Sequence, residues 1–297
     1  MKIIDGGPDA SRLNLVLLSE GYRAQDMPLF RQYAAELARV IESESWYRAG
    51  LLNVHTLEVE SKEPGHWLVP HKRPRDTAFK AELGGEGRVE RLITGDDAAV
   101  RKHVVLWPGP VTLGVLVNSR RHGGRGQDGL FWTCTGPGWT ASAIHEFGHS
   151  FGGLRDEYSD DTGKARRWPA DWPDPEQPNV TIDPTGRKWA HITDTVFEGA
   201  ARHDSGIYRA FKDCRMRTLQ APFCAVCRDV LERKLESYAD DLTEEPEEPE
   251  PDDDDEDENI PESKSFLLQF PGQTGGYSFA DTPEGRLQGI RKLTEIE

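Results

Sequence analysis

The sequence predicts an α/β domain, and three observations lead to this fold class. Residues 13–19 form a mainly apolar run of strand length. Residues 25–41 follow it with apolar side chains at helical spacing. Residues 54–60 and 111–117 then have the composition of further strands. Strands that alternate with helices along a chain are typical of a sheet covered by helices.

The first elements have boundaries that can be placed in the sequence. The run 13–19 is followed by the turn-like segment 20–22, which predicts that the strand ends there. Polar and apolar side chains alternate over residues 54–60, which predicts a half-buried strand. The apolar face of the helix at 25–41 consists of Met27, Phe30, Tyr33, Leu37 and Val40.

Residues 166–189 are rich in Pro, Trp, Asp and Asn and show little periodicity, which predicts a long ordered loop. Long loops in compact domains are often functional, and a decorative insertion is the alternative. Asn179-Val-Thr181 fits a glycosylation acceptor, but this short pattern is common by chance.

Acidic residues dominate the chain after the helix-like segment 225–238. Residues 240–258 contain 14 acidic side chains and no basic one, which leaves −2 of the formal net charge of −16 for the rest of the chain. Such a segment cannot bury enough apolar surface to fold. The sequence therefore predicts a main domain over residues 1–239, an acidic disordered linker over 240–259, and a small C-terminal segment over 260–297, either appended or docked on the main domain.

Composition excludes several classes of function. The folded part is close to neutral, which argues against nucleic-acid binding, because phosphate contacts need a basic surface. The longest apolar runs are strand-sized, so we expect no membrane span. Residues 1–8 lack the basic start and apolar core of a signal peptide, which predicts a cytoplasmic protein or a chain whose leader has been removed. The sequence indicates no particular oligomeric state.

The segment His145-Glu146-x-x-His149 carries the clearest chemical signal. Residues four apart lie on one face of a helix, so both imidazoles can reach a single zinc ion. Glu146 lies one step round the helix and can act as general base toward a water that the ion activates. Apolar neighbours and the stop at residues 152–153 favour a helix here, whereas histidines that only pack or hydrogen-bond are the alternative.

Two acids after the glycine pair are candidates for the third ligand. The metzincin pattern places this ligand three residues after a glycine. Counting from Gly152 reaches Arg155, which does not bind a cation, whereas counting from Gly153 reaches Asp156. Asp156 is therefore the predicted ligand, and Glu157 is the alternative. The acid that does not bind zinc would accept a hydrogen bond from a histidine or the loop.

A second region downstream supports this interpretation. Residues 206–217 contain Met216, one of three methionines in the chain. A methionine in a tight turn beneath the metal is the Met-turn of metzincins, where it forms an apolar floor. A methionine that belongs to the ordinary core is the alternative interpretation.

The sequence resembles the IgA-peptidase family of bacterial zinc metallopeptidases. The likeness rests on residues 145–158, on Cys214-Arg-Met-Arg217 and on Phe223-Cys-x-Val-Cys227, and it covers residues 10–235. It implies a metzincin-like zinc-peptidase domain with a mixed sheet, an active-site helix and a Met-turn. It also implies one catalytic Zn²⁺ with His145 and His149 as ligands, Glu146 as general base and an acid after the glycine pair. The resemblance further implies a protein or peptide substrate and suggests export.

The expected reaction is hydrolysis of an internal peptide bond. Glu146 would take a proton from the attacking water and pass it to the leaving amine. Tyr208 is a candidate donor to the oxyanion because it lies shortly before Met216. A non-catalytic metal-dependent binding domain is the alternative, although such a domain would be expected to lack the general base. An adhesin or scaffold organised by the acidic tail, with calcium at residues 252–257, fits only the end of the chain, which lacks EF-hand spacing.

Four cysteines are too few for a disulfide scaffold in a chain of this length. Cys214 and the Cys224-x-x-Cys227 pair allow three interpretations. A disulfide involving Cys214 would pin the Met216 segment and is favoured. A second, structural zinc would need a fourth ligand such as Cys134 or a histidine. Free buried thiols are the third possibility.

Overall fold

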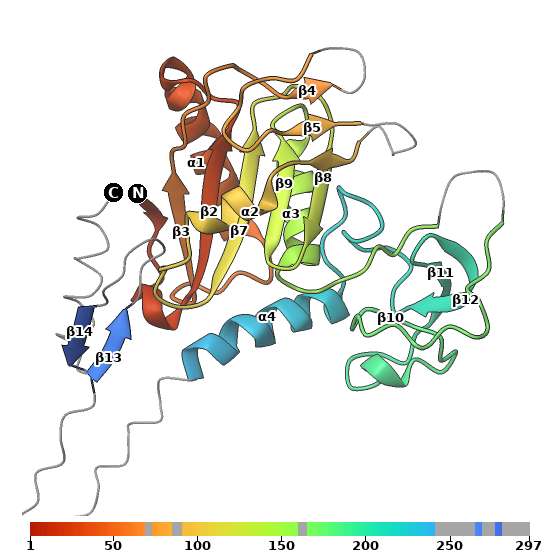
Figure 1. The fold of residues 1–297 in the computed structure, drawn as a ribbon. Helices are drawn as coiled ribbons and strands as arrows, with labels where there is room; N and C mark the ends of the chain where they lie inside the picture. The colour runs from red at the N-terminus through yellow and green to blue at the C-terminus, as the bar shows by residue number, and fades with distance from the viewer. Residues whose placement is uncertain (69–72, 85–90, 160–164, 241–264, 269–276, 281–297) are drawn as a thin grey trace, which may run out of the picture. The chain divides into compact units, whose positions relative to one another are not determined.

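The structure is a computed structural model that describes residues 1–68, 73–84, 91–159, 165–240, 265–268 and 277–280 (Figure 1). The chain divides into two compact units, Met1–Glu245 and Pro246–Glu297. The predicted acidic linker at 240–259 lies outside the described residues, apart from Asp240. The calcium alternative at residues 252–257 lies outside them as well.

The first unit is organised around a six-stranded sheet in the order β1-β3-β2-β7-β9-β8 (Figure 1). The four central strands run parallel, and β1 and β8 pair antiparallel to their neighbours at the two ends of the sheet. The sheet is therefore mixed, and the predicted α/β class with a mixed sheet is confirmed. The strands are β1 (Lys2–Ile4), β2 (Leu13–Glu20), β3 (Leu52–Leu57), β7 (Val111–Val117), β8 (Gly124–Gln127) and β9 (Leu130–Cys134).

Alternate residues of β2 face two different cores. Leu15 and Leu17 lie in an apolar cluster with buried residues of three helices, α1, α3 and α4. Val16 and Leu18 lie in a second cluster with Val100 of α2. Successive side chains of a strand point to opposite faces, so the sheet is buried on both sides. The helices are α1 (Met27–Ser43), α2 (Asp97–Lys102), α3 (Trp139–Ser150) and α4 (Ala225–Asp240), with short 3-10 helices η1 (Asp9–Ser11), η2 (Ala24–Asp26) and η3 (Arg187–Trp189).

Smaller sheets complete the fold. The predicted loop at 166–189 contains β10 and η3, and Trp189 within it is fully buried, so this segment is packed and partly regular. In the second unit β13 pairs antiparallel with β14, and the rest of the predicted segment 260–297 lies outside the described residues. The small sheets consist of β4 (Trp67–Leu68), β5 (Glu82–Leu83) and β6 (Ile93–Thr94), of β10 (Val180–Thr181), β11 (Phe197–Ala200) and β12 (His203–Arg209), and of β13 (Ser265–Leu268) and β14 (Tyr277–Ala280).

The described part of the chain has no helix long and apolar enough to cross a membrane.

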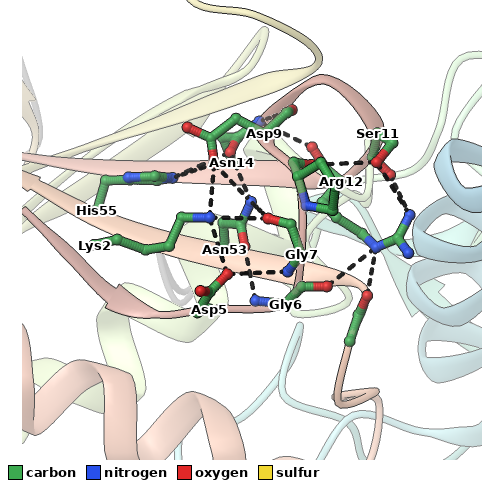
Figure 2. Close-up of polar contacts among 12 residues, drawn as sticks. Lys2, Asp5, Gly6, Gly7, Asp9, Ser11, Arg12, Asn14, Asn53 and His55 are labelled. Carbon is green, nitrogen blue, oxygen red and sulfur yellow. Dashed lines mark hydrogen bonds and ion pairs between the residues drawn. The ribbon is translucent and has the colours of Figure 1, made fainter.

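The predicted strand at residues 54–60 is present as β3 over residues 52–57, but the prediction that it is half-buried is wrong. The strand β3 starts two residues earlier, at Leu52, and its first five residues are buried. The reason is its position between β1 and β2, together with a polar network that satisfies its polar side chains (Figure 2). Asn53 Oδ1 accepts a hydrogen bond from the Gly6 nitrogen at 2.7 Å, and Asn53 Nδ2 donates to Asn14 Oδ1 at 3.1 Å. His55 Nε2 lies 3.1 Å from the same Asn14 oxygen.

We expect the Asn53→Ala variant to be less stable than the native protein by about 1–3 kcal/mol. The substitution leaves the Gly6 nitrogen and Asn14 without these buried hydrogen-bond partners, and an unsatisfied buried group costs about this much. Urea unfolding followed by fluorescence measures the change. Gln32→Ala, on the exposed side of α1, is the control. Equal unfolding free energies for the two variants would contradict the role given to the network.

Candidate active site

Helix α3 positions the residues of the predicted motif. Its buried side chains include Ile144 and Phe147, which anchor the helix in the main core. The helix ends at Ser150, and Gly153 then adopts a left-handed conformation with φ +62° that glycine reaches without strain. The backbone nitrogen of Gly153 donates to the carbonyl of His149 at 3.1 Å. This turn redirects the chain, so the acids that follow return toward the histidines.

Three potential ligand atoms converge beneath α3. His145 Nε2 lies 3.1 Å from His149 Nε2, and Asp156 Oδ1 lies 3.3 Å and 3.1 Å from these two nitrogens. A tetrahedral zinc ion with Zn–N distances of about 2.0–2.1 Å keeps its ligand atoms roughly 3.3–3.4 Å apart. The observed separations therefore fit the edges of a zinc coordination polyhedron, and the donor set of two imidazoles and a carboxylate suits zinc.

Backbone carbonyls orient both imidazole rings. His145 Nδ1 lies 3.0 Å from the carbonyl oxygen of Arg215, and His149 Nδ1 lies 2.6 Å from that of Leu154. A carbonyl oxygen only accepts, so each Nδ1 carries a proton and each Nε2 faces the cluster. A ring that is oriented in this way by a hydrogen bond at its other nitrogen is common among metal-binding histidines.

Glu146 lies against the edge strand β8. A side-chain carbon added at Gly124 would lie 2.5 Å from Glu146 Oε1, and one added at Gly126 would lie 2.2 Å from the Glu146 carbonyl oxygen. Glycine at both positions therefore lets the strand approach the helix this closely. Burial raises the pKa of Glu146 to about 7, which brings it into the range of a general base at neutral pH. Sequence reasoning missed the role of Gly126, which only the packing of β8 on α3 reveals.

The two acids after the glycine pair point to different places. Asp156 faces His145 and His149. Burial alone would raise the pKa of Asp156, but hydrogen bonds from the two histidines hold it well below its usual value. Glu157 is fully buried and does not lie in this group; its Oε1 accepts a hydrogen bond from Asn179 Nδ2 at 2.9 Å. Burial raises the pKa of Glu157 to about 8.

Met216 lies in a turn directly behind the histidines. The turn is closed by the Arg217 nitrogen, which donates to the Cys214 carbonyl at 2.8 Å. Met216 is fully buried, and its sulfur packs so closely on α3 that a side-chain carbon added at Gly148 would lie 2.9 Å from it. The Glu157 nitrogen donates to the Met216 carbonyl at 2.7 Å. The turn therefore holds both the helix and the segment that carries Asp156.

A cavity of about 530 Å³ opens over the histidine cluster. Tyr158 and Arg202 line it, and the Tyr158 hydroxyl accepts a hydrogen bond from Arg202 Nη2 at 3.4 Å. Burial raises the pKa of Tyr158 to about 12, so the phenol keeps its proton at neutral pH. Tyr208, the oxyanion donor predicted from sequence, belongs to β12 and is not among the residues that line this cavity.

The disulfide favoured from sequence is not present, because all four cysteines are free thiols. Cys214 Sγ and Cys227 Sγ lie 3.6 Å apart, well beyond the S–S bond length of about 2.05 Å. Cys224 lies in the same buried group, whereas Cys134 belongs to β9. Three thiols that meet at one point are not arranged as a simple pair.

The fold and this site have the composition of a metal-dependent hydrolase: two histidines and a carboxylate converge at a cavity beside a further carboxylate. A family model described as IgA Peptidase M64 matches residues 1–196 of the 297 residues. The chain belongs to this IgA-peptidase family, so the resemblance seen in the sequence is confirmed. Membership makes the chain a peptidase, a hydrolase that acts on proteins, and suggests a metal ion. No curated protein matches the chain.

Proposed function

We propose that the chain is a zinc-dependent endopeptidase in which His145, His149 and Asp156 hold the ion and Glu146 is the general base. One observation carries this proposal: the three ligand atoms converge within 4.8 Å of one another, next to a buried carboxylate in an open cavity. The close approach of Met216 to α3 and its bond to Glu157 support a metzincin-like arrangement with a Met-turn. The presence of Glu146 argues against a non-catalytic binding domain.

The residues of the site have separate roles in hydrolysis. Zinc, when bound, supplies Lewis-acid chemistry, which lowers the pKa of water to about 7 and polarises a carbonyl. Glu146 accepts a proton from the attacking water and returns it to the leaving amine. Burial in the closely packed contact between α3 and β8 keeps the Glu146 carboxylate in place for both transfers. Tyr158 donates its hydroxyl proton in a hydrogen bond to the developing oxyanion.

The shape of the site favours an endopeptidase. A second cavity, of about 870 Å³, adjoins the first, and both are lined by Gly126, His149, Asp156 and Arg202. A polypeptide can therefore extend to either side of the metal, as cleavage within a chain requires. The strand β8 ends the main sheet and borders both cavities, so an extended substrate can lie beside it as an additional strand.

We expect the Tyr158→Phe variant to lose about 100- to 1,000-fold in kcat with little change in KM. The substitution removes the hydroxyl donor, whose contribution is made mainly in the transition state. Tyr208→Phe is the matched control, because Tyr208 does not line the cavity. Steady-state kinetics on a peptide substrate measures both variants. A large loss of kcat in Tyr208→Phe, together with a near-native kcat in Tyr158→Phe, would instead make Tyr208 the oxyanion donor.

Removal of the metal tests the proposed function directly. We expect 1,10-phenanthroline to abolish cleavage of a quenched fluorescent peptide library, because the water then lacks its Lewis acid. The non-chelating isomer 1,7-phenanthroline is the control and should have no effect. Added Zn²⁺ should restore the lost activity. Cleavage that continues at full rate in the metal-free protein would refute a zinc-dependent mechanism, and zinc binding without cleavage of any library member would favour the non-catalytic alternative.

A further inference from the structure

A second group of potential metal ligands lies beside the candidate active site. It consists of Glu157, Cys214, Cys224 and Cys227, whose ligand atoms all lie within 4.8 Å of one another. The four residues come from three segments of the chain. Glu157 follows α3, Cys214 precedes the turn at Met216, and Cys224 and Cys227 span the start of α4. All four are buried, and the proposed reaction uses none of them.

Two distances within this cysteine cluster are close to those of tetrahedral coordination. Cys214 Sγ lies 3.6 Å from Cys227 Sγ, and Cys227 Sγ lies 3.3 Å from Glu157 Oε1. With Zn–S distances of about 2.3 Å and Zn–O distances of about 2.1 Å, the edges of a tetrahedron are roughly 3.8 Å and 3.6 Å. The Cys224 nitrogen also donates to Cys214 Sγ at 3.2 Å, which helps to hold that sulfur in place.

Neutral thiols and a disulfide both account poorly for this group. A disulfide joins two sulfurs and would leave the third thiol buried beside Glu157. Thiols alone are weak donors, and Glu157 Oε2 is buried without a hydrogen-bond partner in the part of the chain that the structure describes. A buried carboxylate with one unpaired oxygen is costly, whereas a cation bound at Oε1 would offset its charge.

Nearby groups orient the carboxylate and offset its charge. Asn179 Nδ2 donates to Glu157 Oε1 at 2.9 Å, as expected for a carboxylate held in place for a metal. Arg217 Nη1 donates to the Glu157 carbonyl oxygen at 3.1 Å, and the buried Arg209 is close enough for a favourable electrostatic interaction with Glu157. Three thiolates and a carboxylate around Zn²⁺ carry a net charge of −2, which these two guanidinium groups would balance.

We propose that Glu157, Cys214, Cys224 and Cys227 bind a second zinc ion with a structural role. Binding converts the three thiols to thiolates, and their protons leave to solvent. Four protein ligands close the coordination shell, as in structural rather than catalytic zinc sites. Soft thiolate ligands in a tetrahedral arrangement select zinc over magnesium or calcium.

The cysteine cluster ties together the parts that build the candidate active site. Glu157 is the residue after Asp156, and Cys214 lies two residues before Met216. The ion would therefore fix the Asp156 segment and the Met216 turn to the first turn of α4. Glu157, in this arrangement, is a positioning residue that acts through its neighbour.

Metal content of four full-length proteins tests the proposal. We expect two zinc ions per chain in the native protein and one in the His145→Ala/His149→Ala double variant. We expect one in Cys224→Ser, together with a lower unfolding temperature. Cys134→Ser is the matched control, because it changes a buried thiol outside the cluster, and it should retain two zinc ions.

Cobalt substitution of the native protein tests the same site without a destabilised variant. Thiolate ligands give cobalt a sulfur-to-metal charge-transfer absorption that histidine and carboxylate ligands do not give. We expect this absorption in the native protein and in the His145→Ala/His149→Ala variant. Thiol titration should show the three clustered cysteines protected until a chelator is added.

The outcomes separate this proposal from the peptidase function. A native protein that binds one zinc ion, loses it in the histidine variant and shows no cobalt–thiolate absorption would overturn the second site and leave the proposed function intact. A mass two hydrogens lower than expected for free thiols would overturn it in favour of a disulfide. A native protein that binds a single zinc ion, keeps it in the histidine variant and shows the absorption would support the cysteine cluster and refute the proposed catalytic ligands.

Discussion

Replacement of Glu146 with glutamine is expected to lower kcat/KM for peptide hydrolysis by about 100- to 10,000-fold while zinc content and fold are retained. Removal of a general base costs about this much. The amide has nearly the same shape as the carboxyl group and still fits against Gly124 and Gly126. It does not accept the proton of the attacking water, so the loss should fall on kcat and leave KM nearly unchanged.

The measurement compares Glu146→Gln with Glu42→Gln, which makes the same chemical change on the exposed surface of α1. Steady-state kinetics gives the rates, and metal analysis shows whether zinc remains. A Glu146→Gln protein that keeps its zinc and turns over peptide at a near-native rate would show that another group is the base. If this variant loses zinc, its rate says nothing about proton transfer. Such a loss would instead contradict the proposal that Glu146 is not a zinc ligand.

The local part of the site could be predicted because helix geometry fixes it. A spacing of four residues places His145 and His149 on one face of a helix whatever the rest of the fold is. The glycine pair predicts where that helix ends, and in the structure Gly153 adopts the left-handed conformation that follows the helix. The count from Gly153 reaches Asp156, and this side chain does lie against both imidazoles.

The non-local part of the site could not be predicted from spacing. The carbonyl that orients His145 belongs to Arg215, 70 residues away, and its position depends on the packing of the turn on α3. Tyr158 meets Arg202 across 44 residues, whereas Tyr208 is close to Met216 only in sequence. Proximity in sequence to the Met216 turn was therefore a poor guide to which tyrosine lines the cavity.

The same distinction holds for the main sheet. The apolar runs of β2 and β7 are buried on both faces, as central parallel strands usually are, so their composition is sufficient to predict them. The strand β3 is just as buried but contains Asn53 and His55, whose partners come from the residues before and within β2. A polar side chain in a strand indicates solvent exposure unless a hydrogen-bond partner from elsewhere in the chain satisfies it. The sequence of the strand does not show whether such a partner exists.

The positions of the adjacent acids Asp156 and Glu157 depend both on local spacing in the sequence and on the packing of distant segments. Asp156 and Glu157 are equally plausible ligands by residue type, and only the count from Gly153 separates them in the sequence. In the structure the backbone directs Asp156 toward the histidines and Glu157 toward the cysteines. Each carboxylate therefore belongs to a different group of potential ligands, so the two substitutions should have separable effects.

We expect Asp156→Ala to weaken zinc binding at the histidine pair by more than about 100-fold and to abolish hydrolysis with it. Loss of an outer-shell partner typically costs about 10- to 100-fold in affinity, and loss of a direct ligand should exceed this. Two imidazoles remain, but the site then lacks the carboxylate that offsets the charge of the ion. Asp171→Ala, in the exposed part of the loop at 166–189, is the control for removal of an aspartate.

Competition with a chromogenic chelator measures zinc affinity in Asp156→Ala and Glu157→Ala side by side. Each protein is also loaded with cobalt, so the thiolate absorption identifies which site is filled. Asp156→Ala should keep the cobalt–thiolate absorption and lose the metal of the histidine pair. Glu157→Ala should keep the histidine metal and weaken the metal of the cysteine cluster. The reverse pattern would make Glu157 the third ligand of the catalytic zinc. If Asp156 binds that ion, removal of the Asp156 carboxylate must weaken zinc binding at the histidine pair.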